Sequence, residues 1–228
     1  MTAATGIGAA VRRKEDFRFL TGQGHYTDDI NRPGQTHAAI LRSPHADAKI
    51  KSIDTKEAAK APGVIAIFLG RDIAADGIGG LPCGWQIHSK DGKPMAEPPH
   101  PVLAIDRVRH VGDPVAVVVA ETKAEARDAA DLIAVDYEVL PAVVSMQEAL
   151  KPGAMQLFEG APGNLCYDWH IGDKAQVDAA FAKAAHVTKL DIVNNRLVPN
   201  AMEPRAAIGE YDKASGEYTL YTDRKSVV

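Results

Sequence analysis

The sequence is poor in cysteine and aromatic residues and contains no long apolar run. Its 228 residues include two cysteines, Cys83 and Cys166, and only 6% of them are aromatic. Two cysteines are too few for a disulfide framework and fit a reducing compartment, so we expect a cytoplasmic protein. No apolar stretch approaches the roughly 20 residues of a membrane-spanning helix, so we expect no membrane span.

An excess of charge of one sign is also lacking. The 26 basic and 30 acidic residues are interspersed and give a formal net charge of -4. Proteins that bind nucleic acid normally present a basic face, so we expect no nucleic-acid partner. Apolar residues make up 46% of the chain and charged residues 25%, which is ordinary for a globular protein of one large or two modest domains.

The motifs of the common enzyme classes are missing as well. The sequence has no nucleophile elbow, no phosphate-binding loop and no HExxH pattern. The most informative polar pair is Glu203 and Arg205, which would project to the same face of an expected strand. The two side chains could line a site, or they could form a surface ion pair worth at most about 1 kcal/mol, which is the commoner outcome.

A stretch of residues 71–101 is rich in Gly and Pro and shows no periodicity. Loops of this length are usually functional or form an interface. The stretch contains Cys83, Trp85, His88 and His100. Their spacing matches no standard metal-ligand pattern, so we predict no metal site. We interpret the stretch as an insertion loop packed by Trp85 and Ile87, which could pack against a partner subunit.

The strongest periodic signal lies between residues 110 and 141. An unbroken apolar run rich in β-branched residues, 115–120, predicts a buried strand. Thr122 followed by Glu125 predicts a capped helix start, and small apolar residues at helical spacing follow. From Val135 the period drops to two, which predicts a second strand. The same order of strand, alanine-rich helix and strand recurs weakly over residues 48–69.

Other elements follow from shorter signals. We predict further strands over 36–41, 187–194, 202–211 and 217–222, the last two joined as a hairpin by a loop with a glycine near its end. We also predict helices over 145–151 and 173–184, the second capped by Asp173 and carrying an apolar stripe of Val177, Ala180, Phe181 and Ala184. Turn residues at 152–153 and 160–164 make the stretch of about 145–165 the best linker candidate.

Five segments, in order, resemble the large, molybdenum-binding subunit of the molybdenum hydroxylases, the xanthine dehydrogenase and aldehyde oxidase family. They are RKEDFRFLTG (13–22), LRSPHA (41–46), RHVGDPVA (109–116), VDYEVLP (135–141) and NRLVPNAMEPR (195–205). The likeness is closest to the carbon monoxide dehydrogenase large-chain branch. The resemblance implies an α+β fold, in which an α/β hammerhead domain precedes part of an α+β molybdopterin-binding domain. The implied divisions are an N-terminal arm (1–19), the hammerhead domain (20–142), a linker (143–165) and the start of the first molybdopterin-binding domain (166–222).

The resemblance also implies a function and partners. The parent protein would be an oxidoreductase that uses a molybdopterin cofactor to oxidise carbon monoxide, an aldehyde or a heteroaromatic compound. Its partners would be an FAD-binding medium subunit and a small subunit with iron–sulfur clusters, assembled as a homodimer of heterotrimers around a small-molecule substrate.

The family's catalytic segments are not found in this sequence. In the family, a cofactor-contacting glutamine follows the strand that matches residues 218–222, and the catalytic glutamate lies near the far C-terminus. Residues 223–228 read DRKSVV, which one frame of a common sequencing adapter encodes. We therefore expect a non-native tail at 223–228 on an N-terminal fragment that neither holds molybdopterin nor turns over, without catalytic, cofactor-binding or metal residues. The alternative is a non-catalytic interaction module built on the hammerhead scaffold.

Overall fold

The computed structural model describes residues 6–7, 9–195, 197–198, 200 and 205–222. The chain divides into two compact units. The larger unit is Thr36–Thr188, and the smaller unit combines Met1–Gln35 with Lys189–Val228. The domain boundaries predicted from the sequence stay predictions. The expected non-native tail at 223–228 lies outside the described residues.

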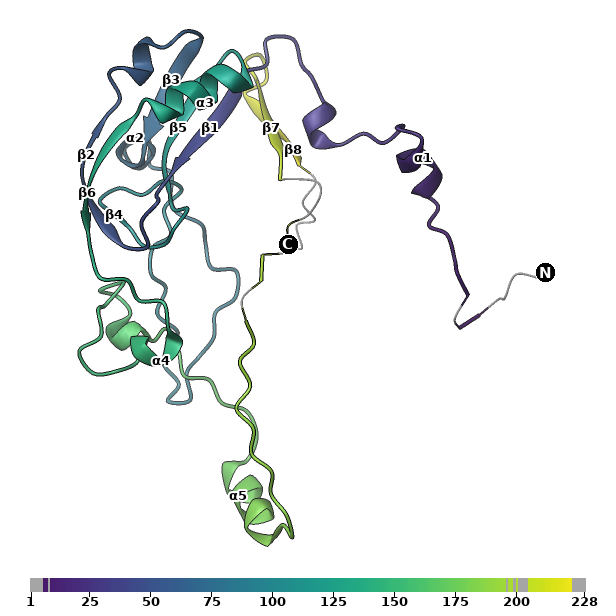
Figure 1. Ribbon diagram of the computed structural model, residues 1–228, viewed down its shortest axis with the longest axis vertical. Coiled ribbons are helices and arrows are strands. Elements are labelled where there is room, and N and C mark those ends of the chain that lie inside the picture. The colour runs from purple at the N-terminus through teal and green to yellow at the C-terminus, as the bar shows by residue number, and fades with distance from the viewer. Residues whose placement is uncertain (1–5, 8, 196, 199, 201–204, 223–228) are drawn as a thin grey trace. The chain divides into compact units, whose positions relative to one another are not determined.

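The larger unit contains two three-stranded antiparallel sheets (Figure 1). The first sheet has the order β1 (His37–Arg42), β5 (Pro114–Ala120), β3 (Val64–Leu69). The second has the order β4 (Arg107–Val108), β2 (Ala48–Asp54), β6 (Ala134–Val139). Helix α3 (Lys123–Asp131) lies along the first sheet (Figure 1). This mixture confirms the predicted α+β class.

Strand β5 and helix α3 form the centre of the core, as the sequence predicts. Val115, Val118 and Ala120 are fully buried because β5 is central and covered on both faces. Val118 packs in one cluster with Ala129 and Ala130 of α3, whereas Val115 packs in a second cluster with Ala48 and Val108 of the other sheet. The helix begins where Thr122 Oγ1 accepts the Glu125 amide at 3.2 Å, the cap expected from the sequence. Its buried face is made of alanines at helical spacing, which lets it approach the sheet closely. These alanines are Ala126, Ala129 and Ala130.

The two strand–helix–strand units differ from ordinary crossovers, because each divides its strands between the two sheets. Strands β2 and β3 belong to different sheets, and so do β5 and β6. The helix expected after Asp54 is only a 3-10 turn, η2 (Ala58–Lys60). Its start lacks a side-chain cap, because Asp54 Oδ1 accepts the Lys56 amide instead. The period of two from Val135 is seen in β6, where Val135 and Tyr137 are half-buried, whereas Val139 is 61% exposed.

The rest of the larger unit is short helices and irregular segments. Helix α2 (Gly70–Ala75) follows β3, and the short helix expected after 145 is α4 (Met146–Ala149), which Ser145 caps. The 3-10 turn η3 (Pro162–Asn164) precedes α5 (Lys174–Lys183), whose predicted cap at Asp173 is confirmed. The expected apolar stripe of α5 is uncovered, since Val177 and Phe181 are 51% and 59% exposed.

The strand predicted over 187–194 is wrong, because this segment has no regular secondary structure. Its alternating pattern is compatible with a strand, but a strand also needs a neighbour to accept its backbone hydrogen bonds. Leu190 and Ile192 are each 78% exposed, so the described part of the chain leaves the apolar side of the pattern largely uncovered.

The smaller unit is built around a β-hairpin of β7 (Ala207–Asp212) and β8 (Glu217–Thr222). The predicted hairpin is confirmed, and Gly216 takes the positive φ (75°) that its loop requires. The unit also contains α1 (Asp16–Leu20) and the 3-10 turn η1 (Thr27–Asp29). Arg32 joins the parts, since its Nε lies 2.6 Å from Glu210 Oε1 and its guanidinium stacks on the Tyr221 ring.

Replacing Gly70 by alanine is expected to destabilise the larger unit by about 2 kcal/mol, the usual cost of overpacking. A Cβ at Gly70 would lie 2.5 Å from the backbone oxygen of Ala104, and backbone cannot move aside cheaply. Urea unfolding of the full chain measures the effect. Gly79→Ala is the matched control, because a Cβ at Gly79 meets nothing within 4 Å. Equal stability of the two variants would contradict the close approach.

Candidate functional site

A buried ion pair links the loop before β2 to strand β4. The Asp47 side chain is inaccessible, and it accepts two hydrogen bonds from Arg107. The distances are 2.7 Å from Nε to Oδ1 and 2.6 Å from Nη2 to Oδ2. The hydrogen bonds to Asp47 raise the pKa of Arg107, although burial opposes this effect. The two-pronged geometry therefore fixes the guanidinium in one orientation.

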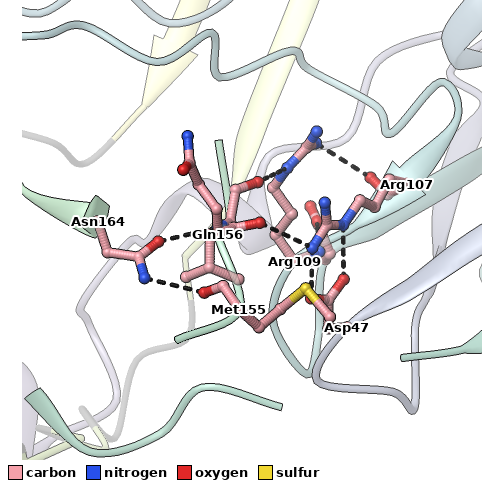
Figure 2. A network of polar contacts seen from close by, with 8 residues as sticks. Asp47, Arg107, Arg109, Met155, Gln156 and Asn164 are labelled. Carbon is pink, nitrogen blue, oxygen red and sulfur yellow. Dashed lines mark hydrogen bonds and ion pairs between the residues drawn. The ribbon is translucent and has the colours of Figure 1, made fainter. Parts of the chain in front are cut away.

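The same arginine and its neighbour hold a second segment, residues 155–164, which we call the strap. Figure 2 shows the arrangement. Arg107 Nη2 donates to the Gln156 carbonyl oxygen at 3.4 Å, and Arg109 Nε donates to that of Leu157 at 2.9 Å. The Arg109 guanidinium also lies 4.5 Å from the centre of the Phe158 ring. Strand β4 and the residue after it thus position the strap.

Asn164 closes the strap from within (Figure 2). Its Nδ2 donates to the carbonyl oxygens of Met155 at 2.9 Å and Ala149 at 3.1 Å, the second of which ends helix α4. Its Oδ1 accepts the Leu157 amide at 2.9 Å. The backbone of Asn164 has a positive φ of 58°, a conformation that asparagine tolerates better than most residues.

A cavity of about 360 Å³ lies against this network. Its apolar walls are Pro98, Pro99, Pro101, Ala104, Leu157 and Phe158. Its polar lining is His100, Arg107, Arg109, His110 and Asp113. Concave, mostly apolar sites with a few polar groups are the usual form of small-molecule sites, and this cavity is the best candidate in the described part of the larger unit.

The loop that leads to this cavity is anchored by backbone contacts rather than by its tryptophan. Lys90 N donates to the Asp168 carbonyl oxygen and Ala96 N to that of Cys166, each at 2.8 Å. The Lys90 ammonium also pairs with the Asp168 carboxylate, which raises the pKa of Lys90. Trp85 is 77% exposed and Ile87 is half-buried, so within this chain the tryptophan does not pack the loop, and packing against a partner subunit stays a prediction. The loop's order comes from hydrogen bonds that a sequence pattern does not reveal.

The pair proposed from the sequence, Glu203 and Arg205, is not tested by the described residues. Glu203 lies outside the described residues, and Arg205 is exposed directly before β7. Their suggested site therefore stays a prediction. The network around Asp47 was missed because its partners lie 60 residues apart in sequence. The RHVGDPVA segment, which contains Arg109 and Asp113, was the available signal.

Within the residues that the structure describes, no three His, Cys, Asp or Glu side chains gather as a metal site would require. Over the same residues, none of the helices combines the length and apolar character needed to cross a bilayer.

Comparison with protein families gives a match over most of the hammerhead prediction. Residues 21–141 match the family model described as aldehyde oxidase and xanthine dehydrogenase, a/b hammerhead domain. The chain belongs to this family. Residues 157–227 match a second model, that of the molybdopterin cofactor-binding domain. The family resemblance seen in the sequence is thus confirmed.

Individual relatives agree with this membership. The chain is 37% identical to the carbon monoxide dehydrogenase large chain of Afipia carboxidovorans, over 95% of this chain and 27% of that one. It is 36% identical to the nicotine 6-hydroxylase large subunit of Paenarthrobacter nicotinovorans, over 94% and 25%. The chain therefore spans about a quarter of the length of these relatives.

Solved structures of family members superpose well. The Cu,Mo-CO dehydrogenase matches with a TM-score of 0.78 and 35% identity, over 96% of this chain and 28% of the other. Quinoline 2-oxidoreductase from Pseudomonas putida 86 also matches with a TM-score of 0.78 and 35% identity, over 93% and 26%.

The described part of the molybdopterin-binding match does not by itself form a cofactor cradle. Between residues 165 and 222 the large side chains are mostly exposed, as Trp169, Ile171 and Leu220 illustrate at 58%, 77% and 67%. A cofactor needs buried polar groups that converge on a cavity, and the candidate cavity takes only Leu157 and Phe158 from this match. We therefore derive no chemical step through molybdopterin from these residues.

Tyr137 makes the stability of the hammerhead domain sensitive to alkaline pH. Burial, with a smaller effect of the Asp113 charge, raises the pKa of Tyr137 above its ordinary value of 10.0. The folded state then holds this proton more tightly than the unfolded state, so stability is retained below about pH 10 and falls as the pH rises above it. Urea midpoints measured from about pH 8 to pH 11 should fall less steeply in Tyr137→Phe.

Phenylalanine is a suitable replacement because it can keep the edge-on contact with the His45 ring, whose centre lies 5.0 Å away. The same alkaline slope in both proteins would contradict the role of Tyr137.

Proposed function

We propose that this chain is the N-terminal part of the large subunit of a molybdenum-dependent oxidoreductase. The observation that carries the proposal is the ordered match of one chain to two family models, the hammerhead domain and the molybdopterin cofactor-binding domain. In this role the chain supplies a scaffold domain and the beginning of the cofactor-binding domain. By itself it does not turn over, because the proposed catalytic segments belong to the remaining length of the parent.

The proposed substrates are carbon monoxide, an aldehyde or a heteroaromatic compound. The names of the relatives support this range, since they include a carbon monoxide dehydrogenase, a nicotine 6-hydroxylase and an aldehyde oxidoreductase. The proposed cofactor of the parent is molybdopterin.

We also propose that the parent works within a complex. The names of several relatives describe them as large chains or subunits, including one called a dehydrogenase complex subunit gamma. The proposed partners are an FAD-binding medium subunit and an iron–sulfur small subunit, assembled as a homodimer of heterotrimers. These partners would accept the electrons that the molybdenum site removes from the substrate.

The test combines the gene locus with metal analysis. Genomic DNA beyond codon 222 is expected to continue into sequence that resembles the family. The full-length product, expressed with its neighbouring subunit genes, is expected to bind molybdenum stoichiometrically, as measured by mass spectrometry of the metal. The 228-residue chain expressed in the same host serves as the control and is expected to carry none. Stoichiometric molybdenum in the short chain, or none in the long one, would refute the proposal.

A further inference from the structure

Arg109 carries a charge that no neighbouring carboxylate neutralises among the described residues. Its Nε and Nη1 donate to the carbonyl oxygens of Leu157 at 2.9 Å and Arg107 at 3.4 Å, and its face covers the Phe158 ring. Carbonyl oxygens and a ring face stabilise a cation without cancelling its charge. Arg107 differs, because Asp47 neutralises it through two short hydrogen bonds.

The cavity beside Arg109 is suited to a ligand with an apolar body. Its volume of about 360 Å³ lies at the lower end of the range for small-molecule sites. Three prolines of residues 98–101 form one wall, and Leu157 and Phe158 contribute further apolar surface. Proline side chains are rigid, so this wall loses little conformational entropy when a ligand packs against it.

The charges around the cavity favour a monoanion over a dianion. Asp113 is the one carboxylate on the lining, and its Oδ2 accepts the Arg109 backbone amide at 2.9 Å. His110 Nδ1 lies 3.7 Å from the same oxygen. Asp113 repels any anion in the cavity, and it repels a phosphate-like dianion more strongly than a monocarboxylate, whose single charge Arg109 can balance.

The Arg109 guanidinium also has N–H groups that could donate hydrogen bonds to a ligand. The bond from Nη1 to the Arg107 carbonyl is long, at 3.4 Å, and Nη2 meets no acceptor among the residues that the structure describes. Arginine binds carboxylates best through two adjacent N–H groups. The Nη1 and Nη2 groups of Arg109 can provide such a pair.

We propose that this cavity binds a monocarboxylate with a compact apolar body, with the carboxylate on Arg109 and the body against the prolines. The same chemistry could come from a free organic acid or from the C-terminal carboxylate of a polypeptide. The proposal concerns only the hammerhead domain and its strap, so it does not depend on the activity of the parent protein.

Amide NMR shifts of the full 228-residue chain test the proposal, with benzoate as the probe. Saturable shifts are expected at Arg109, His110 and Leu157, with none for the uncharged isostere benzamide. N-acetylphenylalanine represents a polypeptide C-terminus. Binding of benzoate alone assigns the site to free acids, and binding of both probes shows that a chain end also fits. Binding of neither, or shifts confined to other surfaces, overturns the proposal.

Variants at the cavity make the test specific. Arg109→Gln is expected to weaken benzoate binding at least about tenfold, because it removes the charged pair. Arg127→Gln, which changes an exposed arginine of α3, serves as the control and should bind as the wild type does. Asp113→Asn covers the case in which Arg109→Gln fails to fold. It should bind benzoate as well as the wild type or better, because a competing carboxylate is gone, and a clear loss there would contradict the proposed charge arrangement.

Discussion

Asp47→Asn is expected to lower the free energy of unfolding of the larger unit by about 3 kcal/mol, the lower end of the cost of breaking a buried ion pair. The amide cannot balance the charge of Arg107, whose side chain is only 19% exposed and has little access to solvent. It also replaces one acceptor with an N–H group that faces the guanidinium. Urea unfolding of the full chain, followed by circular dichroism, measures the change.

An exposed ion pair, that of Glu138 with Lys49, provides the control for this experiment. Glu138 lies 3.7 Å from Lys49, and the two side chains are 46% and 57% exposed. Glu138→Gln should change stability by no more than about 0.5 kcal/mol, because solvent already screens this pair. A double variant of Asp47→Asn with Arg107→Gln should be less destabilised than the sum of its parts, since no unpaired charge remains. Strict additivity would contradict the ion-pair interpretation.

Asn164→Ala is expected to cost about 3 kcal/mol, from three hydrogen bonds at roughly 1 kcal/mol each. The bonds to Ala149, Met155 and Leu157 hold the strap closed, and alanine can make none of them. The affected region is local, so hydrogen exchange of the Leu157 amide reports it most directly. We expect that amide to exchange faster while the amides of β5 keep their protection.

Asn164→Gly separates the side chain from the backbone. Glycine also loses the three hydrogen bonds, but it adopts the φ of 58° without strain, so it should cost about 1 kcal/mol less than alanine. An equal loss of stability in the two variants would show that the left-handed backbone conformation at residue 164 adds no strain to the alanine variant. Unchanged exchange of Leu157 in both would show that Asn164 does not hold the strap.

Local patterns made the centre of the larger unit predictable. The β-branched run of β5 and the Thr122 cap of α3 depend on residues within a few positions of one another, and the structure has both. The hairpin of β7 and β8 follows for the same reason, since its loop and strands are contiguous. Sequence spacing carries such features because the interacting groups are neighbours along the chain.

The rest depended on partners distant in sequence. Asp47 stabilises the fold through its hydrogen bonds with Arg107, and no local sequence pattern predicts that contact. The segment 187–194 shows the reverse, because its alternation satisfies the local requirement for a strand while the described residues offer no neighbour to pair with it. For the candidate site, Glu203 and Arg205 were chosen on spacing alone, whereas the cavity is assembled from three separate stretches.

The division of strands between two sheets has a consequence for synthesis on the ribosome. Strands β1, β2 and β3 are made first, yet none of them pairs with another of the three. Strands β1 and β3 both pair with β5, which is made later, and β2 pairs with β4 and β6, which are also made later. The first sheet therefore cannot close until Ala120 has left the exit tunnel, and the second not until Val139 has. Until then the nascent chain exposes unpaired strands, the condition in which chaperones bind.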